Sequence, residues 1–171
     1  MTPHVGSHAP DFTASDQDGQ TVRLANLRGK PVVLYFYPRA STPGCTIEAR
    51  KFRDAYARIQ ELGAVVLGVS PDTIKAQKKF QINEGLPFPL LADADRTLAL
   101  AYGVIREKSM YGRLFKGVSR MTFIIDGEGV VRRVFEQVKP KEHAAEVIAA
   151  LEELGTASLA PSGDEEKAAE K

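Results

Sequence analysis

The stretch that most constrains the fold is an apolar segment followed by a turn and a long helical pattern. Residues 31–37, PVVLYFY, are typical of a buried strand. Residues 38–44 are rich in proline, glycine, serine and threonine, which favour turns and helix starts. From Cys45 to about Leu62, apolar residues recur every three or four positions, and Gly63 follows. We therefore predict a strand, a tight turn and an amphipathic helix, in that order.

Cys45 is the only cysteine of the chain, and we expect it in the first turn of that helix. With Thr42 as the N-cap, Pro43 takes the first helical position, where its missing N–H costs nothing. The Thr42 hydroxyl is then expected to cap the helix beside Cys45, near free N–H groups and the positive end of the helix dipole. These groups favour a thiolate over a thiol, so we interpret Cys45 as a reactive thiol. A buried structural cysteine is the alternative.

Composition excludes several classes of protein. With 171 residues, 43% of them hydrophobic and 26% charged, the chain is expected to form one domain over residues 1–154. Its net charge of +1 gives no strong attraction to nucleic acid or to a membrane. One cysteine excludes an intramolecular disulfide and a cysteine-rich zinc site. We see no signal peptide and no apolar run near the ~20 residues of a membrane span, so a cytoplasmic location is expected.

The rest of the chain predicts alternating strands and helices. The expected elements are a short hairpin around residues 16–24, a buried strand at 64–70, a helix at 72–84, a strand at 88–93, a short helix at 96–102, two antiparallel strands at 120–126 and 130–135, and a helix at 140–154. The 72–84 helix is expected to turn Ile74, Phe80 and Ile82 inward. The expected inward residues of the last helix are Ala145, Val147, Ile148, Leu151 and Leu154.

Two segments do not fit this alternation. Residues 105–119 are polar and carry a basic cluster, which we interpret as a solvated loop; the cluster comprises Arg106, Lys108, Arg113 and Lys116. Residues 155–171 have no large apolar residue after Leu159 and are expected to be a disordered tail. The order of the other elements predicts an α/β fold, with a central mixed β-sheet and helices on both faces.

The surroundings of Cys45 narrow the chemistry. No histidine is an obvious base, because His4, His8 and His143 are distant in the sequence, so a cysteine–histidine protease is disfavoured. The lack of a Cys-x-x-Cys pair argues against ordinary dithiol exchange. Arg120 opens a predicted strand and is placed to reach the sulfur from the end of a neighbouring strand. A surface ion pair is the alternative role for Arg120.

Several segments together resemble the peroxiredoxins. Pro38-x-x-x-Thr42-x-x-Cys45 is similar to the active-site motif of that family. The fuller run Phe36-Tyr37-Pro38 with Thr42-Pro43-Gly44-Cys45-Thr46 resembles its peroxiredoxin Q branch, also called bacterioferritin comigratory protein. Further similar segments are residues 9–12, 107–112 and 119–126. The resemblance spans about residues 5–154 and implies a thioredoxin-like fold.

The resemblance also implies an activity and a set of site residues. It implies a thiol-specific peroxidase that reduces hydrogen peroxide and organic hydroperoxides and needs no cofactor: no metal, flavin or haem. Cys45 would be the peroxidatic cysteine and would form a sulfenic acid. Arg120 and Thr42 would hold the developing charge together with backbone N–H groups, and Pro38 would shield the sulfur from water. Glu48, one helical turn after Cys45, is placed to orient Arg120.

The chain departs from many relatives at the resolving cysteine. Those relatives carry it five residues after the peroxidatic one, where this sequence has Arg50, and others carry it in the next helix, where residues 72–84 have none. The sulfenic acid is therefore expected to be resolved by an external thiol, which is thioredoxin, glutaredoxin, glutathione or another small thiol. Relatives of this branch are often monomers, and a monomer is expected here.

Two other functions are compatible with a reactive Cys45. One is a thiol-transfer protein that forms mixed disulfides, and the other is a non-catalytic thioredoxin-like binding or chaperone module. The joint presence of Pro38, Thr42, Cys45 and Arg120 favours the peroxidase, because a chaperone or sensor has no need of all four.

Overall fold

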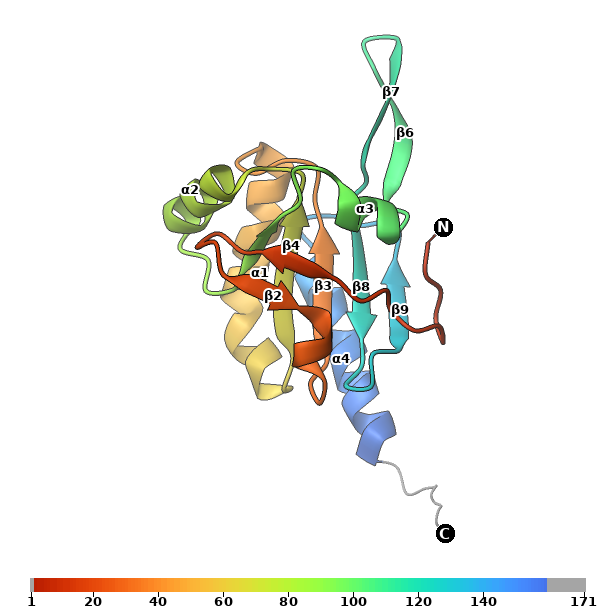
Figure 1. Cartoon of the computed structure of the whole chain (residues 1–171). Helices are drawn as coiled ribbons and strands as arrows, with labels where there is room; N and C mark the ends of the chain where they lie inside the picture. Colours follow the sequence, from red (N-terminus) through yellow and green to blue (C-terminus); the bar gives the residue numbers. More distant parts are fainter. Residues whose placement is uncertain (1, 160–171) are drawn as a thin grey trace.

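A computed structural model describes residues 2–159 of the chain. Its strands and helices largely alternate along the sequence (Figure 1). In chain order they are β1 (Thr13–Ser15), β2 (Thr21–Arg23), the short 3-10 helix η1 (Leu24–Leu27), β3 (Val32–Phe36), α1 (Pro43–Glu61), β4 (Val65–Ser70), α2 (Ile74–Glu84), β5 (Leu90–Ala92), α3 (Thr97–Ala101), β6 (Ile105–Met110), β7 (Arg113–Val118), β8 (Met121–Ile125), β9 (Val131–Phe135) and α4 (His143–Leu159). No helix in this range is long and apolar enough to cross a bilayer.

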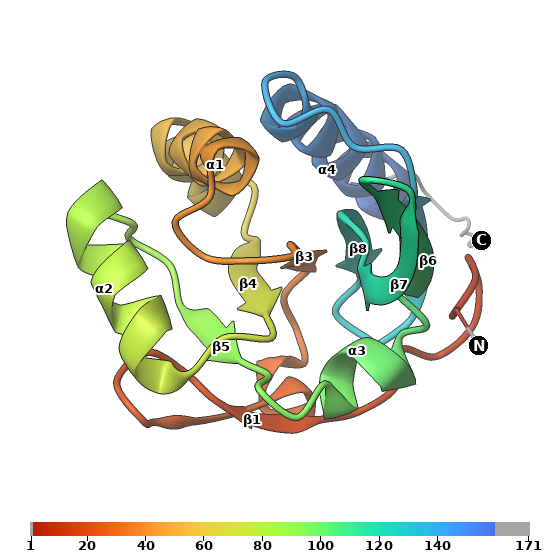
Figure 2. The same ribbon diagram turned by 90° about the horizontal axis from the view of Figure 1, so that it is seen from above.

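Seven strands form one mixed sheet in the order β2-β1-β5-β4-β3-β8-β9. β3 lies near its centre, parallel to β4 and antiparallel to β8, so all five of its side chains are buried. Helices α1 and α4 cover one face of the sheet, and α3 lies on the other (Figure 2). The predicted mixed sheet with helices on both faces is confirmed.

The side chains of β3 contribute to two hydrophobic cores, one on each face of the sheet, because successive side chains of a strand point to opposite sides. Tyr35 belongs to the core under α1 and α4, whereas Leu34 and Phe36 belong to the core under α3. Phe52 of α1 stacks on the Tyr35 ring at 4.6 Å between centroids. Gly68 of β4 leaves room for that ring, since a Cβ there would lie 3.0 Å from it. This packing fixes α1, and with it Cys45, on the central strand.

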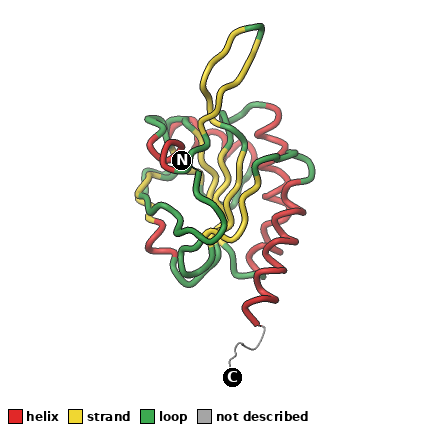
Figure 3. The backbone as a smooth tube through the Cα atoms, turned by 90° about the vertical axis from the view of Figure 1, so that its right-hand side faces the viewer, coloured by secondary structure: helices red, strands yellow, loops and turns green. Residues whose placement is uncertain are grey.

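Residues 105–118 form a hairpin, so the predicted loop is wrong. β6 and β7 pair over six residues as a separate antiparallel ribbon that turns at Tyr111 and Gly112, both with positive φ. Cross-strand pairing satisfies the backbone of a segment that has little apolar surface to bury. The hairpin extends beyond the body of the molecule, from the end of the sheet where α1 begins (Figures 1 and 3).

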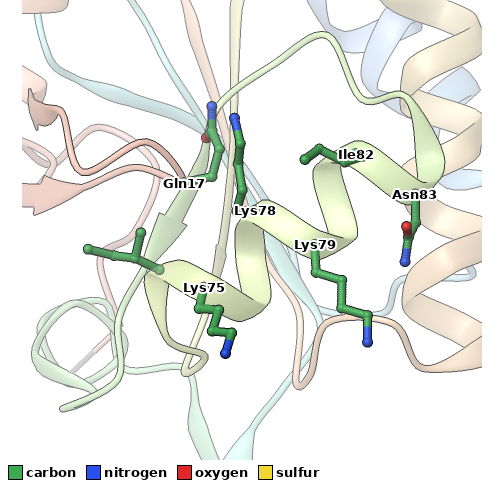
Figure 4. Close-up of a pocket in the computed structure, with 7 residues that line it drawn as sticks. Gln17, Lys75, Lys78, Lys79, Ile82 and Asn83 are labelled. Carbon is green, nitrogen blue, oxygen red and sulfur yellow. The ribbon is translucent and has the colours of Figure 1, made fainter.

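The inward face of α2 differs from the prediction. Phe80 is buried as expected, but Ile74 and Ile82 are 40% and 64% exposed, and Gln77 is buried instead. Gln77 is satisfied there because its amide donates to the Leu91 carbonyl and accepts from the Tyr37 hydroxyl. The two isoleucines line an open hollow of about 670 Å³ along α2 (Figure 4). Its other lining residues are Gln17, Lys75, Lys78, Lys79 and Asn83.

The last helix is displaced along the chain relative to the prediction. α4 begins at His143 and runs to Leu159, so residues 155–159 are helical where a disordered tail was expected. Val147 and Leu151 face the core, but Ala145 is exposed, because the buried residues of the first turn are His143 and its neighbour Ala144. The rest of the expected tail, residues 160–171, lies outside the described residues.

Candidate active site

Cys45 is the third residue of α1, and its residue surface is only 2% exposed. Pro43 occupies the first helical position and Thr42 the N-cap, as predicted. The predicted cap hydrogen bond is wrong, because the Thr42 hydroxyl donates to the carbonyl of Arg39 at 2.7 Å. The hydroxyl therefore closes the preceding turn, and the N–H groups of the first helical turn are not taken by it.

The turn before α1 is held from the next strand. The Asp72 carboxylate accepts the backbone N–H of Ala40 at 2.7 Å and the hydroxyl of Ser70 at 2.6 Å. Pro38 and Thr42 are both half-buried in this turn. Neither forms a side-chain hydrogen bond to the Cys45 sulfur in the described structure, so their roles at the site stay predictions.

Arg120 reaches Cys45 from the neighbouring strand. Phe36 at the end of β3 pairs with Met121 at the start of β8. Arg120 therefore lies at the end of the sheet at which the chain leaves β3 and enters α1. Its Nη1 donates to Cys45 Sγ at 3.4 Å and to Glu48 Oε1 at 2.9 Å. Within residues 2–159 it is the one side chain that hydrogen-bonds the sulfur. The structure thus brings together Cys45, Glu48 and Arg120.

Glu48 is buried behind this contact. Its side chain is 1% exposed, and burial raises its pKa to about 7, although the neighbouring Arg120 acts in the opposite direction. Oε1 accepts a hydrogen bond from Arg120, whereas Oε2 is buried and has no hydrogen-bond partner among residues 2–159. A carboxyl in this setting can hold the guanidinium in place and can itself take up a proton near neutral pH.

The guanidinium of Arg120 is closely confined. Burial would lower its pKa, but Cys45 and Glu48 together raise it, so Arg120 is firmly cationic. A Cβ on Gly44 would lie 3.0 Å from Nη2. Gly44 therefore matters at the site because it lets the guanidinium cross the helix start. This role could not be predicted from the sequence, because it depends on the position of Arg120.

Lys108 is a second cation that the sequence analysis did not place at the site. Its ammonium donates to the Val118 carbonyl at 2.5 Å across the β6–β7 hairpin. Burial and the Arg120 charge lower its pKa, and Cys45 acts in the opposite direction. Lys108 therefore interacts electrostatically with the site from the middle of β6. The motif at residues 107–112 was the one available signal.

A buried polar chain ties β8 to α4 close to Arg120. His143 contacts the Thr122 hydroxyl through Nε2 at 2.7 Å and Glu146 Oε1 through Nδ1 at 3.1 Å. Burial lowers the pKa of His143, so the ring is neutral and Nδ1–H donates to Glu146 while Nε2 accepts from Thr122. Thr122 follows Arg120 by two residues, so this chain fixes the strand that carries the guanidinium.

This arrangement suits a thiolate nucleophile. A buried sulfur faces a guanidinium and the N–H groups of a helix start, and the guanidinium is held by a buried carboxylate. None of these groups lines the hollow along α2. The nearby groups stabilise negative charge on the sulfur and on a small oxygen-containing substrate beside it.

Comparison with known proteins agrees with this geometry. Residues 5–134 match the AhpC/TSA family, and the chain belongs to that family. A putative peroxiredoxin Bcp from Coxiella burnetii is 46% identical over 88% of this chain and 100% of its own length. Peroxiredoxin Bcp from Bacillus subtilis is 43% identical over 90% of this chain and 98% of its own. Proteins so named are thiol-dependent peroxidases, and this chain is an enzyme of that class.

Solved structures place the chain in the Bcp or peroxiredoxin Q branch. The bacterioferritin comigratory protein of Xanthomonas campestris, studied for alkyl peroxide reduction, is 38% identical with a TM-score of 0.81, over 84% of this chain and 92% of that one. A peroxiredoxin Q mutant from Xylella fastidiosa is 31% identical with a TM-score of 0.85, over 90% and 98%. The predicted thioredoxin-like fold is confirmed, and this member of the branch has no second cysteine.

Proposed function

We propose that this peroxidase works with Cys45 as its sole redox centre and that an external thiol resolves the sulfenic acid. The observation that carries the proposal is the contact between Arg120 Nη1 and Cys45 Sγ in a chain with one cysteine. Hydrogen peroxide and organic hydroperoxides are the proposed substrates. A monomer is the proposed oligomeric state.

In the oxidising step, the Cys45 thiolate attacks one peroxide oxygen. An S–O bond forms, the O–O bond breaks, and its electron pair leaves on the second oxygen, which takes a proton to become water or an alcohol. Cys45 is oxidised to a sulfenic acid by two electrons. Arg120 is placed to stabilise the charge that passes along the O–O bond, and Glu48 keeps the guanidinium in that position.

In the resolving step, an external thiolate attacks the Cys45 sulfur. A disulfide forms, the S–O bond breaks, and the departing hydroxide takes a proton and leaves as water. A second thiol then releases Cys45 as the thiolate, so two thiols are oxidised for each peroxide reduced. Arg50, at the position of the resolving cysteine in many relatives, is exposed and its Nε donates to Glu84 at 2.6 Å. It supplies no sulfur and points to a different face of α1.

The test is peroxide consumption by the Cys45→Ser variant in the presence of dithiothreitol. We expect the parent protein to consume hydrogen peroxide and cumene hydroperoxide, and Cys45→Ser to fall to the rate without protein. Ala57→Ser, which adds a hydroxyl at an exposed position of the same helix, should retain full activity. Activity in Cys45→Ser would contradict the proposal. Mixed disulfide formation without peroxide consumption would identify a thiol-transfer protein instead.

A further inference from the structure

The β6–β7 hairpin carries four exposed apolar side chains. Its tip and strands expose Met110 by 57%, Tyr111 by 96%, Leu114 by 69% and Phe115 by 42%. The hairpin extends from the end of the sheet at which α1 begins, clear of the body of the molecule (Figures 1 and 3). Exposed apolar side chains gathered on a projecting element mark an interaction surface.

The two faces of the hairpin differ in charge. Paired residues of an antiparallel ribbon share a face, and successive pairs alternate between faces. Met110 pairs with Arg113, and Lys108 pairs with Phe115, so these four residues form one side, which we name the basic face. The opposite side, which we name the mixed face, consists of Ser109, Leu114, Glu107 and Lys116. The basic face holds cations and apolar groups without a carboxylate, whereas the mixed face carries one charge of each sign.

Lys108 connects the basic face to the active site. It lies in the middle of β6, and its ammonium reaches back to the Val118 carbonyl at the base of the hairpin. Arg120 and Cys45 both influence the pKa of that ammonium. The Phe115 ring and the Lys108 stem lie together, since a Cβ on Gly117 would lie 3.3 Å from the ring and 3.5 Å from the stem. A partner that covers Phe115 would therefore also contact the Lys108 stem, whose ammonium is influenced by Arg120 and Cys45.

Cys45 is buried, and the chain has no second thiol, so its sulfenic acid needs a partner that approaches from outside. We propose that the basic face of the β6–β7 hairpin docks a protein dithiol whose reactive cysteine lies in an apolar surface bordered by carboxylates. The apolar part would cover Met110 and Phe115, and the carboxylates would pair with Arg113. Within residues 2–159, Arg113 forms no ion pair, so its charge is available to a partner. The inference rests on the proposed external resolution.

The chemistry at this docked site is the resolving step with a defined partner. The partner's thiolate attacks Cys45 Sγ, the S–O bond breaks, and water leaves after protonation. The partner's second thiol then attacks its own sulfur in the mixed disulfide, and Cys45 leaves as a thiolate. The partner is oxidised by two electrons to an internal disulfide, so no further reductant enters this step.

The test compares neighbouring residues on opposite faces of one strand. Phe115→Ala and Arg113→Ser change the basic face, and Leu114→Ala and Lys116→Ser are the matched controls on the mixed face. Turnover of peroxide is measured with reduced thioredoxin, with reduced glutaredoxin and with dithiothreitol. We expect the basic-face variants to lower kcat/KM for the better protein reductant by about tenfold, and the controls to change it less than about twofold.

Two further measurements separate docking from chemistry. The rate at which peroxide oxidises Cys45, followed without any thiol, should be the same in all four variants and the parent. Turnover with dithiothreitol should also be unchanged, because a small thiol needs no docking surface. Retained activity with dithiothreitol shows that the variants fold and that external resolution holds, even if the docking inference fails.

Four outcomes would overturn the inference. Equal loss of kcat/KM in basic-face and mixed-face variants would remove the distinction between the faces. No loss in any variant, or no turnover of the parent with either protein reductant, would show that the basic face does not dock a protein dithiol. Binding to phosphatidylglycerol vesicles that is lost in both Leu114→Ala and Phe115→Ala, with normal protein-driven turnover, would assign the hairpin tip to a lipid surface instead.

Discussion

In the proposed mechanism, Arg120 is the residue on which the chemistry depends most after Cys45. One nitrogen, Nη1, contacts both Sγ and Glu48 Oε1, and a second, Nη2, lies against the space that Gly44 leaves open. A guanidinium offers several N–H groups in a rigid plane, so it can hold the carboxylate and still serve the sulfur and the substrate. A lysine ammonium at this position is a single point charge and could not contact the carboxylate, the sulfur and the substrate at the same time.

We therefore expect Arg120→Lys to slow the oxidation of Cys45 by hydrogen peroxide about tenfold or more, which corresponds to ~1.4 kcal/mol of transition-state stabilisation. Stopped-flow mixing of reduced protein with peroxide measures this rate. Arg132→Lys is the matched control, because Arg132 forms an exposed ion pair with Asp126. An unchanged rate in Arg120→Lys would mean that the shape of the guanidinium is unimportant for the reaction.

Glu48 makes a prediction about stability and pH. Its pKa is raised from 4.5 to about 7, chiefly by burial, so the folded protein holds this proton more tightly than the unfolded chain does. The resulting stability is fully present below about pH 4.5 and is lost as the pH rises through about 7. Glu48→Gln removes this dependence. We expect the difference in free energy of unfolding, parent minus variant, to fall by up to ~3 kcal/mol between pH 5 and 8.

Chemical denaturation across this pH range measures the difference. His143 has a lowered pKa, and its effect on stability has the opposite sign, but it is present in both proteins and cancels in the comparison. Parallel stability curves for the parent and Glu48→Gln would show that Glu48 is ionised in the folded protein throughout the range.

At the scale of elements, α1 carries Cys45 at its start and is tied to α2 further along. Arg50 forms an ion pair with Glu84 at the end of α2, and Arg53 donates to the Glu84 carbonyl at 2.8 Å. Arg50 lies five residues after Cys45, about 140° around the helix, so a cysteine there could bond Cys45 only if the first turn unwound. Without such a disulfide, nothing in the proposed cycle requires α1 to open.

We accordingly predict that α1 stays folded in both redox states. Hydrogen exchange across residues 43–52, compared between reduced protein and protein freshly oxidised to the sulfenic acid, should differ by less than about twofold in rate. The C-terminal half of α1 provides an internal reference within the same experiment. Strong loss of protection over residues 43–52 on oxidation would show that the helix unwinds although Arg50 replaces the cysteine.

The elements that the sequence predicted well are those with a strong local signal. The strand at 31–37 is continuously apolar, and Pro43 and Gly44 mark the helix start that follows it. The β6–β7 hairpin has no such signal, because its strands bury few side chains and no apolar alternation develops. The buried face of α2 could not be predicted from the sequence either. Gln77 is buried only because Tyr37 and Leu91, distant in the sequence, satisfy its amide.

Within the site, too, the contacts that depend on residues distant in the sequence were the ones that could not be predicted. The resemblance and the helical spacing indicated Cys45, Glu48 and Arg120, and the structure places these three in contact. The direction of the Thr42 hydroxyl was predicted incorrectly, because a cap bond and a bond to the Arg39 carbonyl are equally consistent with the sequence. The Lys108 ammonium is held at the Val118 carbonyl only because β6 pairs with β7, and no local sequence pattern indicates that pairing.

At the scale of the whole molecule, the site exists because the order of the strands brings distant segments to one end of the sheet. β3 delivers the chain into α1, β8 lies beside β3, and Arg120 precedes β8 directly after the hairpin. The Cys45 sulfur and the Arg120 guanidinium are therefore neighbours in space although 75 residues separate them in the sequence. The fold combines this rigid centre with an exposed arm.

The central claim is that one cysteine carries the whole redox cycle and that the resolving thiol is external. The most direct measurement is mass spectrometry of reduced protein treated with one equivalent of hydrogen peroxide, with dimedone as the trap for a sulfenic acid. We predict one dimedone adduct, on the Cys45 peptide, and recovery of the free thiol when dithiothreitol is added before dimedone. Excess peroxide without a thiol should convert Cys45 to the sulfinic acid. Peroxide consumed over many turnovers without any added thiol, or with Cys45 still in its reduced form and untrapped, would contradict this account.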